Sequence, residues 1–346
     1  MGMPATVEPL ENTLEPDLEI VDAHHHLGDA QGIPYFLDEF LSDTASGHNV
    51  TQSVFAEAGW GWTQDELDPA RGLPEIERVA GLARESERRG GTRIGGILGF
   101  VDLRSGRRAG KVIERAIDVA DGYLAGIRHV TARDSGPSAP PGLRGNSPPF
   151  LMRDPEWRAG FREVVDRGLP FDALVFHPQL EEVAELATAF PDAVIVLDHM
   201  GFPLTTGSYA GRPEQTLLEW RSAHEVLARH PGINVKIGAL GTPVLRQLFH
   251  PDPTVPATSE ALAEEWRPLV RWLLDLYGAD RCLVGSNFPS SGVTCRYHTM
   301  LNAIKRVFSD LSPSEKQQVF AGTARRLFGL GVPNIDVVPQ RREGED

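Results

Sequence analysis

The sequence predicts an α/β protein of a single domain, a (β/α)8 TIM barrel, and two observations carry this prediction. Short apolar segments alternate with amphipathic ones along the chain, as they do when parallel strands alternate with helices. The connections that lead into the apolar segments are short and built from Pro and Gly, whereas several that leave them are long. In such a barrel the long loops gather over the carboxyl ends of the strands, where these enzymes keep their sites.

Each expected strand is a short apolar run bounded by turn residues. In chain order the strands are residues 18–25, 50–57, 93–101, 123–130, 171–176, 193–199, 233–238 and 281–286. Helices are expected at 73–89, 107–121, 154–167, 180–190, 214–229 and 259–277, and segments near 297–308 and 313–328 close the domain. We therefore assign residues 18–330 to the barrel, 1–17 to an N-terminal extension and 331–346 to a C-terminal tail.

Composition excludes several classes of protein. Of the 346 residues, 41% are apolar, which is ordinary for a globular chain, and no apolar stretch reaches the roughly 18 residues that a membrane helix needs. The first residues are acidic and rich in proline, unlike an export signal, and two cysteines, Cys282 and Cys295, cannot form a disulfide framework. We expect a cytoplasmic protein.

The charge of the chain bears on its partners. A formal net charge of -14 argues against nucleic-acid binding, because phosphate contacts need clustered Lys and Arg. The expected partner is a small-molecule substrate, with neither nucleic acid nor membrane involved. A homodimer is left open.

The string VDAHHHLGD places His24 and His26 two residues apart at the end of the first expected strand. Side chains at i and i+2 of a strand lie on one face, so both imidazoles can point at the same spot. Imidazole nitrogen is a good ligand for zinc, manganese or iron. A tag remnant or a surface accident would also give a histidine run, but the position after a strand and before a glycine disfavours a tag.

Three further strand ends carry polar residues that would project into the same mouth. His177, His199 and Asn287 follow the fifth, sixth and eighth expected strands. A lone histidine after an apolar run is more often a hydrogen-bonded structural residue, yet four histidines at the ends of three strands favour a site. Asp198 either orients an imidazole through its second nitrogen or faces into the barrel wall.

Other residues near the mouth are candidates for substrate binding. Arg128 and Lys236 lie at strand ends, where each either holds a carboxylate or pairs with a barrel carboxylate, and the two interpretations are equal. Trp60, like Trp62, either walls an aromatic or apolar substrate or covers the rim. Gln179 offers neutral hydrogen bonds. Covalent catalysis has little support, because the sequence has no GxSxG elbow and neither cysteine has an evident histidine partner.

The chain resembles a known family at a series of motifs. These are DAHHHL at 22–27, HPQL at 177–180, LDHMG at 197–201, NVKIG at 234–238, GSNFP at 285–289 and the closing FAGTARRLFGL. Together they are similar to the second amidohydrolase family, metal-dependent hydrolases on TIM barrels, over roughly residues 18–330. Relatives include lactonases of sugar lactones and pyrone dicarboxylates, and non-oxidative decarboxylases of aromatic acids. The motifs indicate the family and leave the reaction open.

The resemblance implies that His24, His26 and His177 are metal ligands, and that His199 ligates or hydrogen-bonds the attacking water or the substrate. Lys236 is not on the strand where some dinuclear relatives carry a carbamylated lysine, and the fourth strand offers Arg128 instead. One divalent metal is therefore expected, with zinc preferred, manganese open, and a metal-free site as the alternative.

The chain departs from the family at the eighth strand. Relatives carry Asp in GSDWP-like strings, whereas this chain has Asn287 in GSNFP. A neutral amide is a weak ligand and cannot act as a base at pH 7, so proton transfer must move elsewhere. The best acceptors are His199, held by Asp198, and Glu57 at the end of the second strand. Three neutral histidines leave the metal charge uncompensated, which favours ionisation of a bound water.

We therefore expect a hydrolase that opens a lactone or related cyclic ester of a small, carboxylated substrate by attack of a metal-bound water. In this scheme His199, Asp198 and Asn287 are catalytic and Arg128 holds a substrate carboxylate. One alternative is a non-oxidative decarboxylase of an aromatic acid, although such relatives commonly carry glutamate where this chain has His24. Another is a degenerate barrel that binds a ligand without turnover.

Overall fold

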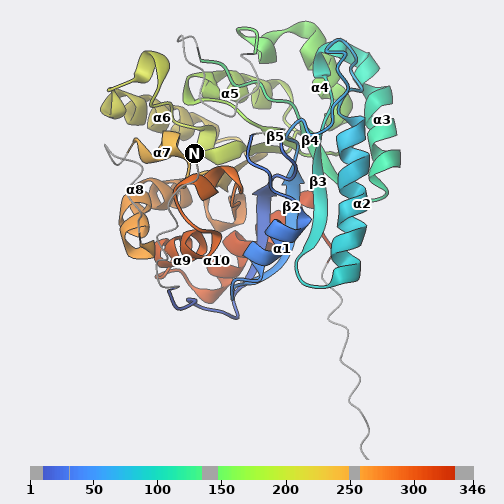
Figure 1. Ribbon diagram of the computed structural model, residues 1–346. Coiled ribbons are helices and arrows are strands. Elements are labelled where there is room, and N and C mark those ends of the chain that lie inside the picture. The colour runs from blue at the N-terminus through green and yellow to red at the C-terminus, as the bar shows by residue number, and fades with distance from the viewer. Residues whose placement is uncertain (1–10, 31, 135–146, 249–257, 332–346) are drawn as a thin grey trace, which may run out of the picture.

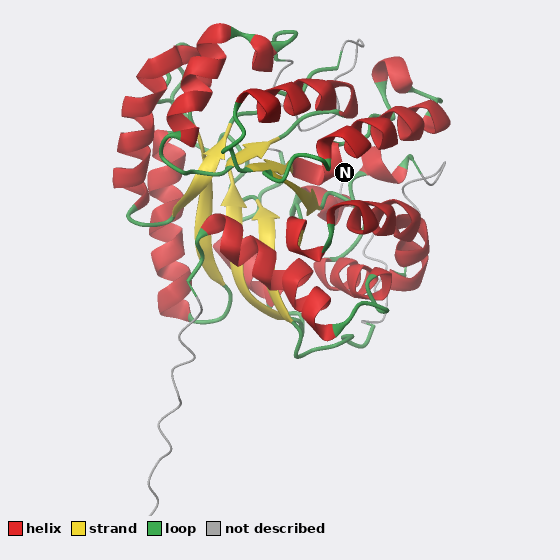
Figure 2. Ribbon diagram, turned by 180° about the vertical axis from the view of Figure 1, so that it is seen from behind, coloured by secondary structure: helices red, strands yellow, loops and turns green. Residues whose placement is uncertain are grey.

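A computed structural model describes residues 11–30, 32–134, 147–248 and 258–331. Eight parallel strands lie in sequence order in one sheet, and the helices between them surround it (Figures 1 and 2). The single-domain TIM barrel is thereby confirmed. The strands are β1 Glu19–His25, β2 Asn49–Ala56, β3 Arg93–Phe100, β4 Leu124–Arg128, β5 Phe171–Ala173, β6 Ile195–Leu197, β7 Ile233–Ile237 and β8 Cys282–Val284.

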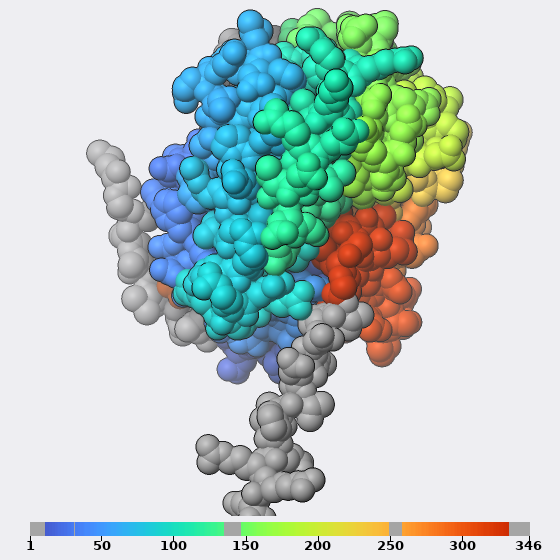
Figure 3. Space-filling view, turned by 90° about the vertical axis from the view of Figure 1, so that its right-hand side faces the viewer, coloured from blue at the N-terminus to red at the C-terminus, as the bar shows by residue number. Residues whose placement is uncertain are grey.

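The helices lie where the amphipathic segments indicated, with two additions. The larger ones are α2 Leu73–Arg89, α3 Ala109–Ala120, α4 Pro155–Val165, α5 Leu180–Ala189, α6 Pro213–Leu227, α8 Ser259–Tyr277 and α9 Tyr297–Val307. Two short helices were not expected, α1 Leu37–Thr44 and α7 Pro243–Arg246. The last expected helix is divided into α10 Pro313–Gln317, a π-helical turn Gln318–Gly322 and α11 Thr323–Phe328. Figure 3 shows the C-terminal part of the described chain, in red, on the same face of the molecule as the green and blue-green segments of its first half.

Strands β5, β6 and β8 are shorter than expected, with three residues each. After β5 and β6 the chain turns into short 3-10 segments, η3 His177–Gln179 and η4 Asp198–Gly201. Residues 174–176 and 198–199, which were expected in the strands, are therefore outside the paired sheet, although Phe176 keeps extended backbone. The early turns place His177 and His199 on irregular backbone at the carboxyl ends of the strands.

The barrel is nearly closed by contacts between β1 and the segment after β8. The Asn287 N–H donates to the His24 carbonyl at 2.7 Å, and the His26 N–H donates to the Phe288 carbonyl at 2.8 Å. Asp22, buried on β1, accepts the N–H of Ser286 at 2.7 Å. The strand that carries the histidine pair is thus fixed against the strand end that carries Asn287.

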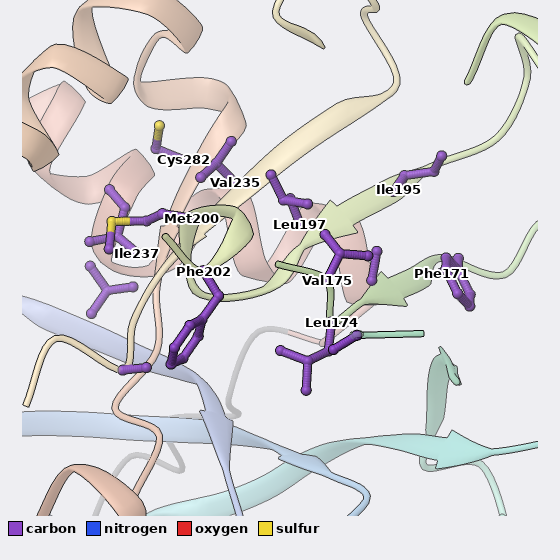
Figure 4. Packing of buried hydrophobic residues seen from close by; sticks show 14 of the residues in the cluster. Phe171, Leu174, Val175, Ile195, Leu197, Met200, Phe202, Val235, Ile237 and Cys282 are labelled. Atoms are coloured by element: carbon purple, nitrogen blue, oxygen red, sulfur yellow. The ribbon is translucent and has the colours of Figure 1, made fainter. Parts of the chain in front are cut away.

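The core has two parts. Residues between the strands and the outer helices form the larger cluster, part of which Figure 4 shows around β5 to β8. A smaller cluster fills the barrel interior, where Val21, Val54, Leu98 and Leu283 pack with α11 and its neighbours. The C-terminal helix thus covers the amino-terminal end of the barrel, where Arg325 pairs with Glu19 at the start of β1, and the polar site lies at the opposite, carboxyl ends of the strands.

The expected N-terminal extension and C-terminal tail lie partly outside the described residues. Of the extension, residues 11–15 pack on α9 and its neighbours. The Lys305 ammonium donates to the carbonyls of Leu14 and Glu15, both at 2.8 Å, and the Asn302 amide donates to the Asn12 carbonyl at 3.0 Å. Within the described part of the chain, no helix combines the length and apolar character needed to cross a membrane.

Replacing Asp22 by Ala should destabilise the fold, because its carboxylate joins β1 to β8 and α9. The substitution leaves the Ser286 N–H and the Tyr297 hydroxyl, which donates to Asp22 at 3.1 Å, without their buried acceptor. We expect the free energy of unfolding to fall by about 2–4 kcal/mol in denaturant titration. The matched variant Tyr297→Phe removes one of these bonds and should cost roughly 1 kcal/mol; equal losses would contradict this role of Asp22.

Candidate active site

His24, on β1, and His26, directly after the end of β1, meet through their Nε2 atoms. The Nε2 atoms of His24 and His26 lie 3.2 Å apart, and both side chains are buried. His26 is held by its Nδ1, which lies 2.8 Å from the Ala56 carbonyl on β2. On its other side, His26 Nε2 lies 3.2 Å from Oδ1 of Asn287. The strand spacing therefore directs both rings to one spot, as the sequence indicated.

This donor set fits a cation. Burial, together with Arg128, lowers the pKa of His26 to about 3, so the ring is neutral and carries one proton. That proton lies on Nδ1, where the Ala56 carbonyl accepts it, and Nε2 is left with a lone pair facing Oδ1 of Asn287. Two acceptors at 3.2 Å with no hydrogen between them are the arrangement that a bound metal ion would satisfy.

The tautomer of His24 decides whether a third lone pair joins this point. Its Nδ1 lies 3.2 Å from Oδ1 of Asp198 and 3.1 Å from Nζ of Lys236. If Nδ1 donates to Asp198, Nε2 offers a lone pair beside that of His26; if Nδ1 accepts from Lys236, Nε2 donates to His26. The first form is the carboxylate–histidine arrangement that supports metal ligation.

His199 lies against the same pair from η4. Ligand atoms of His24, Asp198 and His199 all lie within 4.8 Å of one another, and the His24 and His199 ring centroids are 4.6 Å apart. The Nδ1 of His199 is buried with no hydrogen-bond partner among the described residues. A buried lone pair costs less than a buried N–H without an acceptor, so we assign the proton of the neutral ring to Nε2. Burial lowers the pKa of His199 to about 3.

The backbone that carries His199 is left-handed over four consecutive residues. The φ angles are 50° at His199, 59° at Met200, 63° at Gly201 and 23° at Phe202. Only glycine adopts this region without steric cost, and each other residue costs on the order of 1–2 kcal/mol. Figure 4 shows Met200 and Phe202 among the buried side chains of β6 and β7. Strain is thus concentrated where the site is built.

Helix α6 holds this turn through the carbonyl of Met200. The Trp220 indole N–H donates to that oxygen at 2.6 Å, and His224 Nε2 lies 3.1 Å from it. The other nitrogen of His224 lies 2.9 Å from the Tyr277 hydroxyl on α8, and all three side chains are buried. Two donors on one carbonyl fix the strained turn, and hence the place of His199, from outside the barrel.

Two buried cations and two carboxylates lie beneath the histidines. Lys236 Nζ donates to Asp172 at 2.6 Å and to Asp198 at 2.8 Å. Arg128 donates from Nη2 to Asp198 at 2.9 Å and from Nη1 to the Glu57 carbonyl at 2.9 Å, and its Nε lies 3.2 Å from Asp172. Burial opposes ionisation of Asp198, but Lys236, His24 and Arg128 together hold its pKa well below the ordinary value.

This network changes the expectation for three predicted substrate-binding residues. Lys236 is fully buried in ion pairs, and Arg128 is 3% exposed in the same network, so both show the alternative interpretation, pairing with barrel carboxylates. Gln179 accepts the N–H of Arg133 at 2.8 Å and donates to the Thr131 carbonyl at 2.7 Å. Its amide therefore ties two loops together instead of facing a ligand.

His177 lies apart from the His24 group. The Leu204 N–H donates to its Nδ1 at 3.0 Å, which places the proton of the neutral ring on Nε2. That Nε2 lies 3.8 Å from Oε2 of Glu219, and the ring packs edge-on against Tyr209. In this arrangement His177 presents an N–H donor, whereas a metal ligand would present a lone pair.

The loop after β2 is organised by a residue that the sequence analysis missed. Glu75, fully buried on α2, accepts the N–H of Ala58 at 2.9 Å, the N–H of Trp60 at 2.8 Å and the indole N–H of Trp62 at 2.7 Å. Glu57 precedes this loop and lies 3.5 Å from Nη1 of Arg128. Burial and Glu57 raise the pKa of Glu75 to about 7, against the effect of its donors. Its only signal in sequence is an acid on the apolar face of α2.

Trp60 lies at the start of this loop, above β1. It packs on Gly28, where a Cβ atom would collide with its ring, and against Phe36 and the guanidinium of Arg78. Asp172 is the other residue that the sequence analysis missed. Its signal was a charge inside the apolar segment FDALVF, which suits a buried partner for Arg128 and Lys236.

A (β/α)8 barrel whose strand ends bring together histidines, carboxylates and buried cations defines an enzyme with its site at the barrel mouth. The profile described as amidohydrolase matches residues 21–330. The chain therefore belongs to the amidohydrolase family and is a hydrolase, as its motifs indicated.

Curated relatives cover most of the chain. A protein of Sinorhizobium fredii, uncharacterized protein y4mH, is 28% identical and spans 90% of this chain and 99% of its own. L-fucono-1,5-lactonases of Burkholderia ambifaria and Burkholderia multivorans are 27% and 26% identical. They span 91% and 70% of this chain, and 97% and 73% of their own length.

Solved structures share the fold at lower identity. An amidohydrolase of Burkholderia multivorans with bound zinc has a TM-score of 0.68 at 22% identity, covering 90% of this chain and 99% of that one. A probable 2-pyrone-4,6-dicarboxylic acid hydrolase of Acinetobacter baumannii has 0.59 at 14% identity, covering 90% and 99%. A 5-carboxyvanillate decarboxylase of Novosphingobium aromaticivorans with manganese has 0.52 at 13%, covering 93% and 99%.

Replacing Trp220 by Phe should destabilise the left-handed turn, because the Met200 carbonyl loses one of its two donors. We expect a loss of about 1–3 kcal/mol in unfolding free energy, measured by denaturant titration. Trp272→Phe is the matched control, since Trp272 packs against Trp220 with ring centroids 5.3 Å apart and ring planes inclined by 47°, but its indole does not donate to Met200. An equal loss in the control would assign the effect to ring packing alone.

Proposed function

We propose that this enzyme opens a lactone or related cyclic ester of a small substrate by hydrolysis. The observation that carries the proposal is the convergence of His24 Nε2, His26 Nε2 and Asn287 Oδ1, with the ring of His199 beside that of His24. The relatives named L-fucono-1,5-lactonase support lactones as the substrate class. Free Cys282 and Cys295 lie outside this group of residues, so a covalent thiol route has no support from the geometry.

His24 and His26 would hold a divalent metal, with the Asn287 amide oxygen as a weak third ligand. Bound there, the ion supplies a Lewis acid that polarises a carbonyl and lowers the pKa of water. Asp198 orients His24 through Nδ1, and its ionised state is secured by Lys236 and Arg128. With two imidazole nitrogens and one neutral amide oxygen as the proposed ligands, we expect a modest affinity for the metal, and the proposal includes zinc and manganese.

The remaining histidines, His199 and His177, are proposed to donate hydrogen bonds to the substrate. His199 and His177 both carry the proton on Nε2, so each can donate a hydrogen bond to a carbonyl oxygen or to a leaving oxygen. We assign to His199 the hydrogen bond that stabilises the substrate oxygen, because it lies beside the His24 group and its neutral ring carries the proton on Nε2. Asn287 and the ion-paired Asp198 are poor bases at neutral pH.

A lactone panel tests the reaction. We expect proton release in a pH-stat with sugar lactones, and a fall in rate when the protein is treated with a strong chelator and a recovery on adding zinc or manganese. Carbon dioxide release from aromatic acids with no lactone hydrolysis would move the protein to the decarboxylases. Saturable ligand binding without any turnover would favour a degenerate barrel.

Asn287→Asp should tighten metal binding, because it replaces a neutral ligand by a charged one beside His26 Nε2. We expect the metal Kd to fall by roughly 10- to 100-fold, measured by competition with a fluorescent chelator. Activity should rise less, since the added charge also raises the pKa of a metal-bound water. His177→Ala is the matched control and should change the Kd little; a large loss of metal would return His177 to the ligands.

A further inference from the structure

Arg71 stands out at the barrel mouth because its guanidinium has no acid partner within the part of the chain that the structure describes. It follows the loop after β2, and its guanidinium carbon lies 4.6 Å from the Trp62 ring centroid and 5.0 Å from that of Phe100, the last residue of β3. Among the described residues it makes no ion pair and no side-chain hydrogen bond, and its Nε is buried without an acceptor. The half-buried side chain keeps part of its surface accessible.

This state is costly and differs from that of the neighbouring arginines. Arg104, two residues beyond Asp102, pairs with it, and Arg128 at the end of β4 is ion-paired to Asp198. The chain has 48 acidic residues and a net charge of -14, so acidic side chains are abundant, yet none of those that the structure describes pairs with Arg71. A partly buried guanidinium without an acceptor loses hydrogen bonds to water that nothing in the described protein replaces.

We propose that Arg71 binds a carboxylate group of the substrate. The proposal deepens the proposed function, on which it rests for the identity of the ligand as a substrate. Arg128, the residue expected to bind a carboxylate, is already occupied by Asp198, Asp172 and Glu57. The two Nη groups of Arg71 have no partner among the residues described and can supply the two parallel hydrogen bonds that a carboxylate accepts.

The surroundings hold the guanidinium in place for this task. The guanidinium lies over the rings of Trp62 and Phe100, which restrict its orientation. The Trp62 indole in turn donates a hydrogen bond to Glu75. Phe100 contacts His129, which follows Arg128 at the end of β4, with ring centroids 5.4 Å apart. A ligand held at the His24 pair and a carboxylate held at Arg71 would thus be bound from neighbouring strand ends of one mouth. Stacked arginines lose little freedom on binding, which favours affinity.

The test compares two ligands that differ in one group, D-glucaro-1,4-lactone, with a free carboxylate, and D-glucono-1,4-lactone, with a hydroxymethyl group in its place. Binding to each is measured by calorimetry with the wild-type protein, Arg71→Met and Arg71→Lys. Methionine keeps an apolar contact with the two rings. We expect wild type to prefer the carboxylated lactone, Arg71→Met to lose this preference by roughly 10- to 100-fold, and Arg71→Lys to lie between.

Arg104→Met is the matched control, since it removes the same charge nearby from an arginine already paired with Asp102. Its preference should stay within about twofold of wild type, whereas an equal drop would assign the effect to general charge and overturn the proposal. Equal affinities of wild type for the two lactones, or no saturable binding of the carboxylated one, would also overturn it. Carboxylate preference without hydrolysis would refute the proposed function alone, and hydrolysis without preference would refute only this inference.

Discussion

The burial of two positive charges inside the barrel is the constraint on which the site depends. Lys236 and Arg128 lie on β7 and β4 with almost no exposure, and a buried charge is tolerated only when it is paired. Asp172 and Asp198 provide the pairing, and Asp198 also faces Nδ1 of His24. The same carboxylate thus neutralises the interior charges and offers an acceptor to Nδ1 of His24, so the ion pairs and the histidine site share one residue.

Side chains from the outer helices fix two loops of the site that the strands alone do not hold in place. Trp220 and His224 on α6 hold the left-handed turn of η4, and Glu75 on α2 gathers the loop that carries Trp60 and Trp62. In both cases a helix presents a polar side chain inward to satisfy backbone or indole groups of a loop. The rigidity that a site requires therefore comes from the outer ring as much as from the barrel.

Much of the fold was predictable from sequence, because apolar periodicity reports burial directly. Helix α2 begins and ends at the expected residues, and all eight strands lie within or beside their expected ranges. Helices α1 and α7 were not predicted, because segments of eight and four residues are too short to show a helical repeat of apolar residues. The pair His24 and His26 was predictable because both lie on one strand. The ion pairs that Arg128 and Lys236 form with buried carboxylates could not be predicted. Whether a cation at a strand end turns inward or outward depends on carboxylates that are distant in sequence.

The support of the β2 loop by Glu75 bears on how such an enzyme diversifies. All three contacts of the carboxylate are to two backbone N–H groups and one indole, so most side chains of residues 58–62 are free of it. Gly59 and Gly61 have φ angles of 83° and 74°, Ala58 is buried and Trp62 binds Glu75, so Trp60 is the position of this loop that can change while the loop keeps its path. Related proteins can therefore acquire new ligand specificity by a substitution in this loop, while the buried ion pairs of the barrel stay unchanged.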